Sequence, residues 1–305
     1  MTVALLGTGR MGSAMARAIS AGASSSASAG TFELLLWNRS PQPAVALAAE
    51  LGGRVVETPA EAARQASICL TMLADQRAVE AVYAGPDGLI AGTGRGSVLV
   101  DLSTVAPDSI LGLETAVRAS GAGLLDAPVS GSVTTATAGQ LTLMVGGRAS
   151  DLERARPVLD LLARKIFHLG PLGSGAAMKL AVNTVVVGLN GALAEGLVLA
   201  ERAGIDRNAA YNVLVESAAG APYVAYKRSA FVDPEASPTA FALELAEKDL
   251  RLIIELADRL DVALPQARTN LDTIRQAEAS QGPQADLASV AGHLRAGVPT
   301  SGGRA

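Results

Sequence analysis

The sequence has few of the residues from which disulfides, metal centres and cysteine- or histidine-based catalytic sites are built. Its 305 residues include one cysteine, Cys69, and two histidines, His168 and His293. A single cysteine excludes an internal disulfide, and its place in the apolar run Ser67–Leu73 predicts a buried, inert thiol of the kind found in a reducing compartment. The histidines show no metal-ligand spacing and no local signature of a Ser-His-Asp triad. We therefore expect no bound metal.

Charge is also low and evenly spread. The 25 Lys and Arg residues are scattered among 29 Asp and Glu residues, which predicts no basic patch for nucleic acid. No basic segment precedes an apolar one at the N-terminus, so we expect no secretory signal and a cytoplasmic protein. The one apolar stretch long enough to span a bilayer, Leu180–Ala200, carries Asn183, Asn190 and Glu195 and lacks basic flanks. We therefore expect a helix buried in protein, with no membrane as partner.

Short apolar runs alternate with helical patterns over the first half of the chain. Such alternation predicts an α/β fold with right-handed crossovers and a doubly wound, mostly parallel sheet of the Rossmann type. Helices are expected at Pro41–Gly52, Ala106–Gly121 and Ala149–Lys165, and a loop at Ala21–Gly30. The expected strands are Thr2–Gly7, Glu33–Asn38, Arg54–Glu57, Ser67–Leu73, Ser97–Ser103, Gly123–Ser130 and Gly139–Gly147.

The strand patterns stop near the segment GPLGSG, which we take as a domain boundary. Residues 1–170 are predicted to form the α/β domain and residues 171–293 an all-helical domain, followed by a disordered tail over 294–305. The helical domain would begin with a long apolar helix over 174–203 that joins the two domains. Its surface exceeds what one small helical domain readily covers, which favours a homodimer.

A glycine pattern follows the first expected strand. Gly7, Gly9 and Gly12 form G-x-G-x-x-G between that strand and a helix. The first glycine permits a tight turn, the second lets the backbone approach a pyrophosphate, and the third packs the helix against the strand. The N–H groups at the start of the helix, which includes Arg10 and Met11, would then face the phosphates. The pattern predicts a dinucleotide-binding site.

The end of the second expected strand indicates which dinucleotide is bound. An acidic side chain there would bind the ribose hydroxyls of NAD, but the sequence has Asn38, Arg39 and Ser40. These residues offer a neutral donor, a fixed cation and a hydroxyl, which suit the 2′-phosphate of NADP. NADP is therefore the expected cofactor, and the alternative is that Arg39 is a solvated loop cation.

Polar residues form a stripe on the long helix. At 100° per residue, Lys179, Asn183 and Asn190 lie within about 40° of one another among Leu, Val and Ala. A lysine among apolar groups has a lowered pKa, which suits proton transfer to a carbonyl or from an alcohol. The pattern equally allows a lysine that reaches solvent and asparagines that bond to a neighbouring helix.

On a later expected helix, Asp249 lies on the same face as apolar residues. Its carboxylate therefore needs a buried partner.

Four motifs resemble those of the β-hydroxyacid dehydrogenase family, which contains 3-hydroxyisobutyrate dehydrogenases and tartronate semialdehyde reductases. The motifs are GTGRMGSAMA, DAPVSGSVTTATAGQLTLMVGG, GSGAAMKLAVN and KDLRL, and the resemblance covers nearly the whole chain. It implies an oxidoreductase that transfers a hydride between nicotinamide, here expected to be that of NADP, and a small β-hydroxy acid, aldehyde acid or keto acid. The substrate would lie between the two domains.

The resemblance also implies roles for individual residues. Ser130 and Gly131 would bind the substrate carboxylate. Lys179 would be the general acid/base, and Asn183 would orient the substrate. The residues implied to lie near the cofactor are Met72, Leu73, Ser103, Thr104 and Lys248.

One departure from the family pattern leaves the substrate open. Where the family usually has Ser-Gly-Gly, this chain has Ser130-Gly131-Ser132, and the added hydroxyl changes the carboxylate site. The related imine reductases share the architecture but usually replace the catalytic lysine, so Lys179 favours a hydroxy acid over an imine. The other alternative is a non-catalytic NADP-binding protein, against which Lys179 and Asn183 count.

Overall fold

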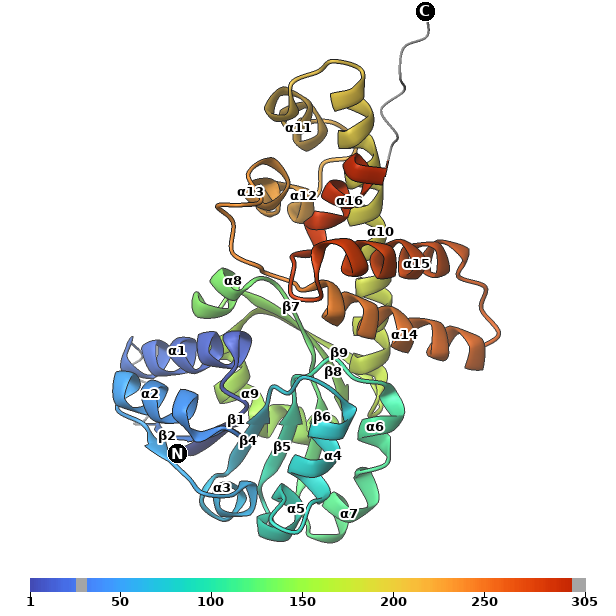
Figure 1. Cartoon of the computed structure of the whole chain (residues 1–305). Coiled ribbons are helices and arrows are strands. Elements are labelled where there is room, and N and C mark those ends of the chain that lie inside the picture. Colours follow the sequence, from blue (N-terminus) through green and yellow to red (C-terminus); the bar gives the residue numbers. More distant parts are fainter. Residues whose placement is uncertain (26–31, 298–305) are drawn as a thin grey trace, which may run out of the picture. The chain divides into compact units, whose positions relative to one another are not determined.

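The computed structural model describes residues 1–25 and 32–297. The chain divides into two compact units, Met1–Lys179 and Leu180–Ala305, so the division falls inside the helix α10 (Ser174–Arg202). Figure 1 labels the helices and strands along the chain. Each unit has its own apolar core.

The first unit is built on a sheet that is mostly parallel. Its strand order is β3-β2-β1-β4-β5-β6-β8-β7, and β9 also pairs with β8. Strands β1 to β6 run parallel to one another, whereas β8 runs antiparallel to β6 and β7. The predicted doubly wound α/β fold is confirmed. The strands are β1 (Thr2–Leu6), β2 (Glu33–Trp37), β3 (Arg54–Val55), β4 (Ile68–Thr71), β5 (Val98–Asp101), β6 (Gly123–Asp126), β7 (Val129–Ser130), β8 (Leu141–Gly147) and β9 (Ala163–Gly170).

Helices cover both faces of this sheet. In β1, Val3 and Leu5 belong to one core cluster and Ala4 and Leu6 to another, because successive side chains of a strand point to opposite faces. Residues of α1, α2, α8 and α9 complete the first cluster, and residues of α3 to α7 complete the second (Figure 1). These helices are α1 (Arg10–Ser25), α2 (Pro41–Leu51), α3 (Pro59–Gln65), α4 (Gln76–Ala84), α5 (Leu89–Gly92), α6 (Pro107–Leu111), α7 (Glu114–Ala119), α8 (Val133–Thr137) and α9 (Ala149–Leu162).

The strand order reverses at β1, and this reversal positions the candidate cofactor site. Strands β2 and β3 lie on one side of β1, and β4, β5 and β6 lie on the other. In sheets of this kind, ligands bind beyond the carboxyl ends of the strands at the reversal. The segments that leave β1 and β4 begin there with Gly7 and Met72, and Met72 N donates a 2.9 Å hydrogen bond to Leu6 O.

Two predicted segments of the sheet region differ in the structure. The expected strand Gly123–Ser130 is broken into β6 and β7, with Pro128, which has no N–H to donate, in the break. The expected helix Ala149–Lys165 ends at Leu162, and the chain continues as β9. Because β9 is largely exposed and carries charged residues, it lacks the continuous apolar run by which buried strands are recognised.

Other boundaries differ as well. The expected helix Ala106–Gly121 is two helices, α6 and α7, interrupted at Gly112, a residue type with low helix propensity. The expected loop Ala21–Gly30 begins later, because α1 continues to Ser25, and the remainder lies outside the described residues. Of the expected tail, residues 294–297 belong to the last helix and residues 298–305 lie outside the described residues.

The second unit is helical. Apart from one bridge between Ala242 and Asp286, its described residues form no strand. Its core joins α10 to the later helices, and Lys227 Nζ forms an ion pair of 2.6 Å with Asp286 Oδ1 within it. These helices are α11 (Arg207–Glu216), α12 (Pro222–Tyr226), α13 (Arg228–Val232), α14 (Leu243–Arg259), α15 (Pro265–Gln281), η1 (Leu287–Ser289) and α16 (Val290–Gly297).

Candidate functional site

The three glycines after β1 serve two different purposes. Gly7 has φ +99°, and a Cβ added there would lie 2.2 Å from Met72 O. A Cβ on Gly12 would lie 1.9 Å from Gly7 O, so both glycines are required by close packing. A Cβ on Gly9 would meet nothing within 4 Å, which leaves its backbone open to a ligand at the start of α1. The turn therefore fits the pyrophosphate of a dinucleotide.

The segment after β2 lies beside this turn. Thr8 N donates to Asn38 Oδ1 at 3.1 Å, and Asn38 Nδ2 donates to Ser40 O at 2.9 Å. The amide of Asn38 therefore joins the glycine turn to the end of β2. Arg39 and Ser40 are exposed beside this link, whereas Met11, on α1, packs against the core.

A buried hydrogen-bond network lies under the loops after β4 and β5. Thr71 Oγ1 and Ser103 Oγ both donate to Asp101 Oδ1, at 2.7 and 2.8 Å. Tyr83 Oη lies 3.0 Å from Thr71 Oγ1, and Leu73 N donates to Ser103 Oγ at 2.9 Å. Because the hydroxyl protons point to Asp101, the oxygen of Ser103 is free to accept from Leu73. The network therefore fixes the Met72–Leu73 loop against the segment that carries Ser103.

The pKa of Asp101, the carboxylate at the centre of this network, differs from its ordinary value. Burial raises the pKa of Asp101 to about 6, although the hydrogen bonds from Thr71 and Ser103 oppose the rise. The hydroxyl of Ser103 is thus used inside the protein, and its neighbour Thr104 is half-buried. Sequence reasoning singled out Ser103 but missed Asp101, whose only sequence signal is an acidic residue at the end of an apolar run.

The turn after β7 carries the residues implied for carboxylate binding. Gly131 has φ +148°, and a Cβ there would lie 2.5 Å from Thr135 Oγ1, so glycine is required. Ser132 is the N-cap of α8, since its Oγ accepts a 3.2 Å hydrogen bond from Thr135 N. Its hydroxyl oxygen is therefore engaged as an acceptor in its own turn, and Ser130 is half-buried beside it.

The polar stripe of α10 consists of Lys179, Asn183 and Asn190, and its two asparagines form hydrogen bonds with different parts of the second unit. Lys179 and Asn183 stand one turn apart on a continuous helix. Asn183 is 5% exposed, and its Nδ2 donates to Asp249 Oδ2 at 2.6 Å. The predicted buried partner of Asp249 is therefore confirmed, and Lys248 Nζ lies 2.9 Å from Asp249 Oδ1. These contacts place Lys248 and Asn183 around one carboxylate.

The third residue of the stripe is part of the helical core. Asn190 Nδ2 donates to Leu287 O at 3.0 Å, and Tyr223 Oη donates to Asn190 Oδ1 at 2.8 Å. Asn190 thus bonds to neighbouring helices, which is the structural role that the sequence also allowed for the asparagines of the stripe. We therefore assign it no role in the site.

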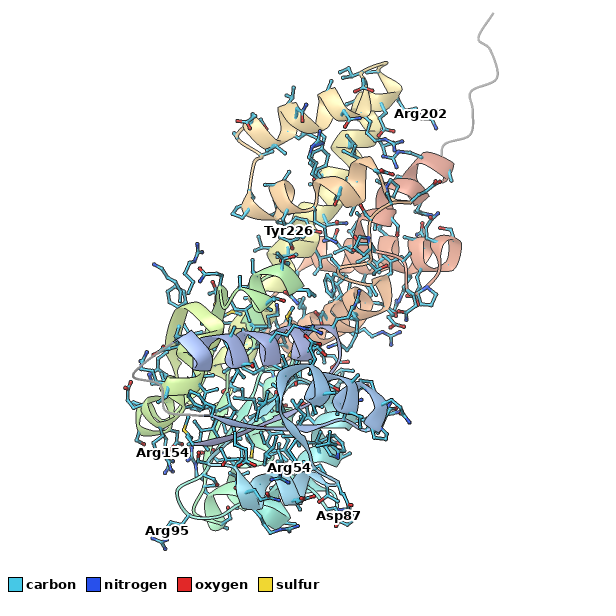
Figure 2. All side chains as sticks on the ribbon, turned by 90° about the vertical axis from the view of Figure 1, so that its left-hand side faces the viewer. Arg54, Asp87, Arg95, Arg154, Arg202 and Tyr226 are labelled. Carbon is cyan, nitrogen blue, oxygen red and sulfur yellow. The ribbon has the colours of Figure 1, made fainter. Side chains whose placement is uncertain are left out.

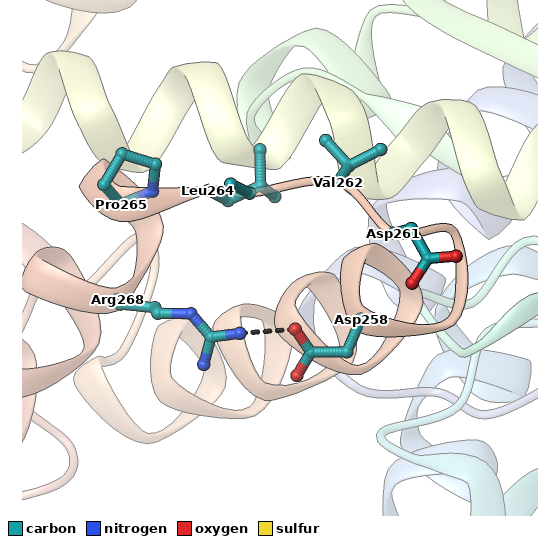
Figure 3. A pocket seen from close by; sticks show the side chains of 7 residues that line it. Asp258, Asp261, Val262, Leu264, Pro265 and Arg268 are labelled. Carbon is teal, nitrogen blue, oxygen red and sulfur yellow. Dashed lines mark hydrogen bonds and ion pairs between the residues drawn. The ribbon is translucent and has the colours of Figure 1, made fainter.

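One pocket of the second unit lies apart from the candidate residues in the sequence. A pocket at the turn between α14 and α15 has apolar lining from Leu264 and Pro265 and an ion pair between Arg268 and Asp258 (Figure 3). None of the candidate residues lines it, so we assign it no function.

Charged side chains of the first unit are mixed in sign over its surface. Arg54, Asp87, Arg95 and Arg154 stand at separate points in Figure 2. Arg54 and Arg154 each form an ion pair with a carboxylate.

Comparisons with known proteins divide the chain in a similar way. Residues 2–170 match the family model described as the NAD binding domain of 6-phosphogluconate dehydrogenase. Residues 173–294 match the model described as the NAD-binding domain of NADP-dependent 3-hydroxyisobutyrate dehydrogenase.

Individual relatives agree with these matches. The chain is 32% identical to glyoxylate/succinic semialdehyde reductase 2 of Arabidopsis thaliana, over 97% of this chain and 80% of the relative. A solved structure of 3-hydroxyisobutyrate dehydrogenase from Salmonella typhimurium matches with a TM-score of 0.85 and 26% identity, over 96% of this chain and 99% of the other. An imine reductase from Pseudomonas sp. has the same fold, with a TM-score of 0.62 and 19% identity over 96% and 99% of the two chains.

Proposed function

Because the chain belongs to the β-hydroxyacid dehydrogenase family, we propose that it uses NADP and acts on small aldehyde or keto acids. The family assignment makes it a nicotinamide-dependent dehydrogenase or reductase of the 3-hydroxyisobutyrate dehydrogenase type. The observation that carries the proposal is the pair on α10. Lys179 stands one turn from Asn183, which a 2.6 Å hydrogen bond fixes to Asp249. A positioned amide beside a lysine can orient a carbonyl for proton transfer.

In the proposed mechanism, Lys179 moves the proton. It donates a proton to the carbonyl oxygen as the hydroxyl forms, and it removes that proton in the reverse direction. The bound nicotinamide supplies or accepts the hydride. Asn183 orients the reacting carbon and oxygen, and Asp249 keeps its amide in place. The protein thus contributes placement and proton transfer.

The proposed carboxylate site is the turn Ser130–Ser132. Backbone N–H groups of this turn and the hydroxyl of Ser130 can donate to a carboxylate. The oxygen of Ser132 caps α8 as an acceptor, so its O–H group can also donate to a bound carboxylate. The departure from Ser-Gly-Gly is therefore compatible with the proposed acid binding.

The proposed cofactor site surrounds the carboxyl end of β1. Gly9 and the start of α1, with Arg10 and Met11, would hold the pyrophosphate, and Arg39 with Ser40 would bind the 2′-phosphate. The turn at Gly9 fits this role because a Cβ there would enter open space. The other residues of the first unit that we propose near the cofactor are Gly7, Gly12, Asn38, Met72, Leu73, Ser103 and Thr104.

Substrate preference tests this proposal. NADPH oxidation is followed at neutral pH with small semialdehydes and keto acids, with the methyl esters of the same acids, and with cyclic imines. We expect the free acids to exceed their esters in kcat/KM by about tenfold or more, because a neutral ester loses charge-assisted bonds worth about 1.5–3 kcal/mol. Cyclic imines should be poor substrates, since they leave the same donors unpaired. Efficient reduction of imines without reduction of any acid would establish the imine reductase alternative instead.

We further propose a homodimer, formed in the cytoplasm, through the exposed face of α10. Val185, Ala192 and Leu199 are spaced seven residues apart and therefore share one face of the helix, with Val185 62% and Leu199 73% exposed. By length and composition alone, α10 is also the one helix of the described residues that could cross a membrane. An apolar stripe on a two-fold axis can pack against its own copy.

Sedimentation velocity tests the dimer. The double variant Val185→Glu/Leu199→Glu is expected to sediment as a monomer, because it buries like charges in the self-contact. Val45→Glu is the matched control, since Val45 is a 54% exposed valine on α2. A wild-type monomer, or a double variant that stays dimeric, would contradict the proposed interface.

A further inference from the structure

A buried carboxylate at the end of β6 holds a segment that is distant in sequence. Asp126 is 0% exposed, and its Oδ1 accepts from Gly173 N at 2.8 Å while its Oδ2 accepts from Ala176 N at 2.7 Å. Gly173 immediately precedes α10 and Ala176 lies in its first turn, where a helix leaves its first N–H groups without partners inside the helix. Asp126 therefore supplies acceptors for the first turn of α10.

The fit around this carboxylate is tight on two sides. A Cβ on Gly146, in β8, would lie 2.4 Å from Asp126 Oδ1, and a Cβ on Gly175 would lie 2.2 Å from Met144 O and 3.0 Å from Asp126 Oδ2. The first turn of α10 is thus in direct contact with the ends of β6 and β8. A shift of this turn would have to break its bonds to Asp126 or open the contact at Gly175.

The same carboxylate connects two segments that the proposed reaction needs. Ser130 follows Asp126 by four residues, and Lys179 follows Ala176 by three, within the next turn of the helix. All of these residues belong to the first unit. The geometry of Lys179 relative to the carboxylate-binding turn therefore depends on how the start of α10 is held against β6.

We propose that Asp126 is a positioning residue for proton transfer, because its carboxylate fixes the first turn of α10 and thereby places Lys179 relative to Ser130. The inference rests on the proposed role of Lys179 as the proton donor. It gives Asp126 no contact with the substrate or with the cofactor. Both carboxylate oxygens accept hydrogen bonds, so a substitute must provide two acceptors at the same place.

The test variant is Asp126→Asn, which keeps the size of the side chain. Its amide retains one acceptor oxygen and presents an NH₂ group to the other backbone N–H, so one bond to the helix is lost. We expect kcat to fall by about tenfold or more, because small misplacements of catalytic groups are costly. The Kd for NADPH should change by no more than about twofold, since the glycine turn at Gly7 and Gly9 is untouched. Asp126→Ser, which also offers one acceptor and is smaller, should show the same split if the asparagine variant folds poorly.

A matched control separates positioning from general stability. Asp151 is another buried carboxylate of the first unit, at 2% exposure, and it pairs with Arg118 at 2.5 Å and Arg154 at 2.6 Å. Asp151→Asn should lower the melting temperature as Asp126→Asn does, because both remove a buried charge from its partners. It should leave kcat of the folded protein unchanged. An equal loss of kcat in both variants would overturn the proposal in favour of a structural role.

A double-mutant cycle decides whether Asp126 acts through Lys179. In the Lys179→Ala background, Asp126→Asn should change kcat by less than about twofold, because the group that it positions is already gone. Multiplicative losses, or an unchanged kcat in Asp126→Asn alone, would overturn the inference. If Lys179→Ala itself keeps full turnover, the proposed function fails, and this outcome is distinct from the failure of Asp126.

Discussion

Replacing Lys179 by alanine is expected to lower kcat by at least about a hundredfold while NADPH binds normally, as removal of a general acid does. Lys179 stands on a helix whose first turn is held by Asp126, and Asn183 one turn later is held by Asp249. Both supports remain in the variant, so the fold and the cofactor site should survive. Steady-state kinetics, together with NADPH titration followed by fluorescence, measure the two effects separately.

Two further variants test whether the effect is specific to proton transfer by Lys179. Lys179→Arg should not restore turnover, because a guanidinium keeps its protons near neutral pH and cannot exchange them with the substrate. Lys165→Ala is the control, since Lys165 is an exposed lysine in β9. Normal turnover in Lys179→Ala would show that Lys179 is not the general acid, and the acid would have to be another group.

Replacing Arg39 by alanine is expected to weaken NADPH binding by about 1.5–3 kcal/mol and to leave NADH binding nearly unchanged. The side chain is exposed next to Asn38, whose amide ties the end of β2 to the glycine turn. The loss should therefore be confined to the 2′-phosphate, which only NADPH carries. Isothermal titration calorimetry with both cofactors gives the comparison directly.

The control for this effect is another arginine of the first unit. Arg95 is exposed and precedes β5, whereas Arg39 follows the carboxyl end of β2, so Arg95→Ala should leave both affinities unchanged. Similar losses for NADPH and NADH in Arg39→Ala, or tighter binding of NADH by the wild-type protein, would show that Arg39 does not select NADP.

The fold was predictable where burial imposes a pattern. Strands β1, β4 and β5 are buried on both faces, so each reads as a short apolar run that the sequence reveals. Strand β9 is an exposed edge strand with polar residues, and its first three residues, Ala163–Lys165, continue the helical pattern that the sequence predicts. The break between β6 and β7 depends on Pro128 and on a change of partner from parallel to antiparallel, which no local pattern reports.

The candidate site was predictable in part. The glycine turn and the one-turn spacing of Lys179 and Asn183 are local features, so the sequence shows them. The need of Asp249 for a partner was also visible, but the partner lies 66 residues away in the chain. Asp101 and Asp126 were missed because each acts on backbone or hydroxyl groups brought to it by the sheet, and an acidic residue at a strand end does not say which groups those will be.

The unequal surroundings of the three glycines after β1 have a consequence for evolution. Replacement of Gly7 or Gly12 brings a methyl group against a backbone carbonyl, so descendants that retain the fold must retain both residues. Replacement of Gly9 meets open space, so a lineage that no longer bound a dinucleotide could lose it without cost to packing. Among homologues of this fold, the middle glycine is therefore the informative position: its loss would mark members that have given up the cofactor, whereas the two outer glycines would persist in either case.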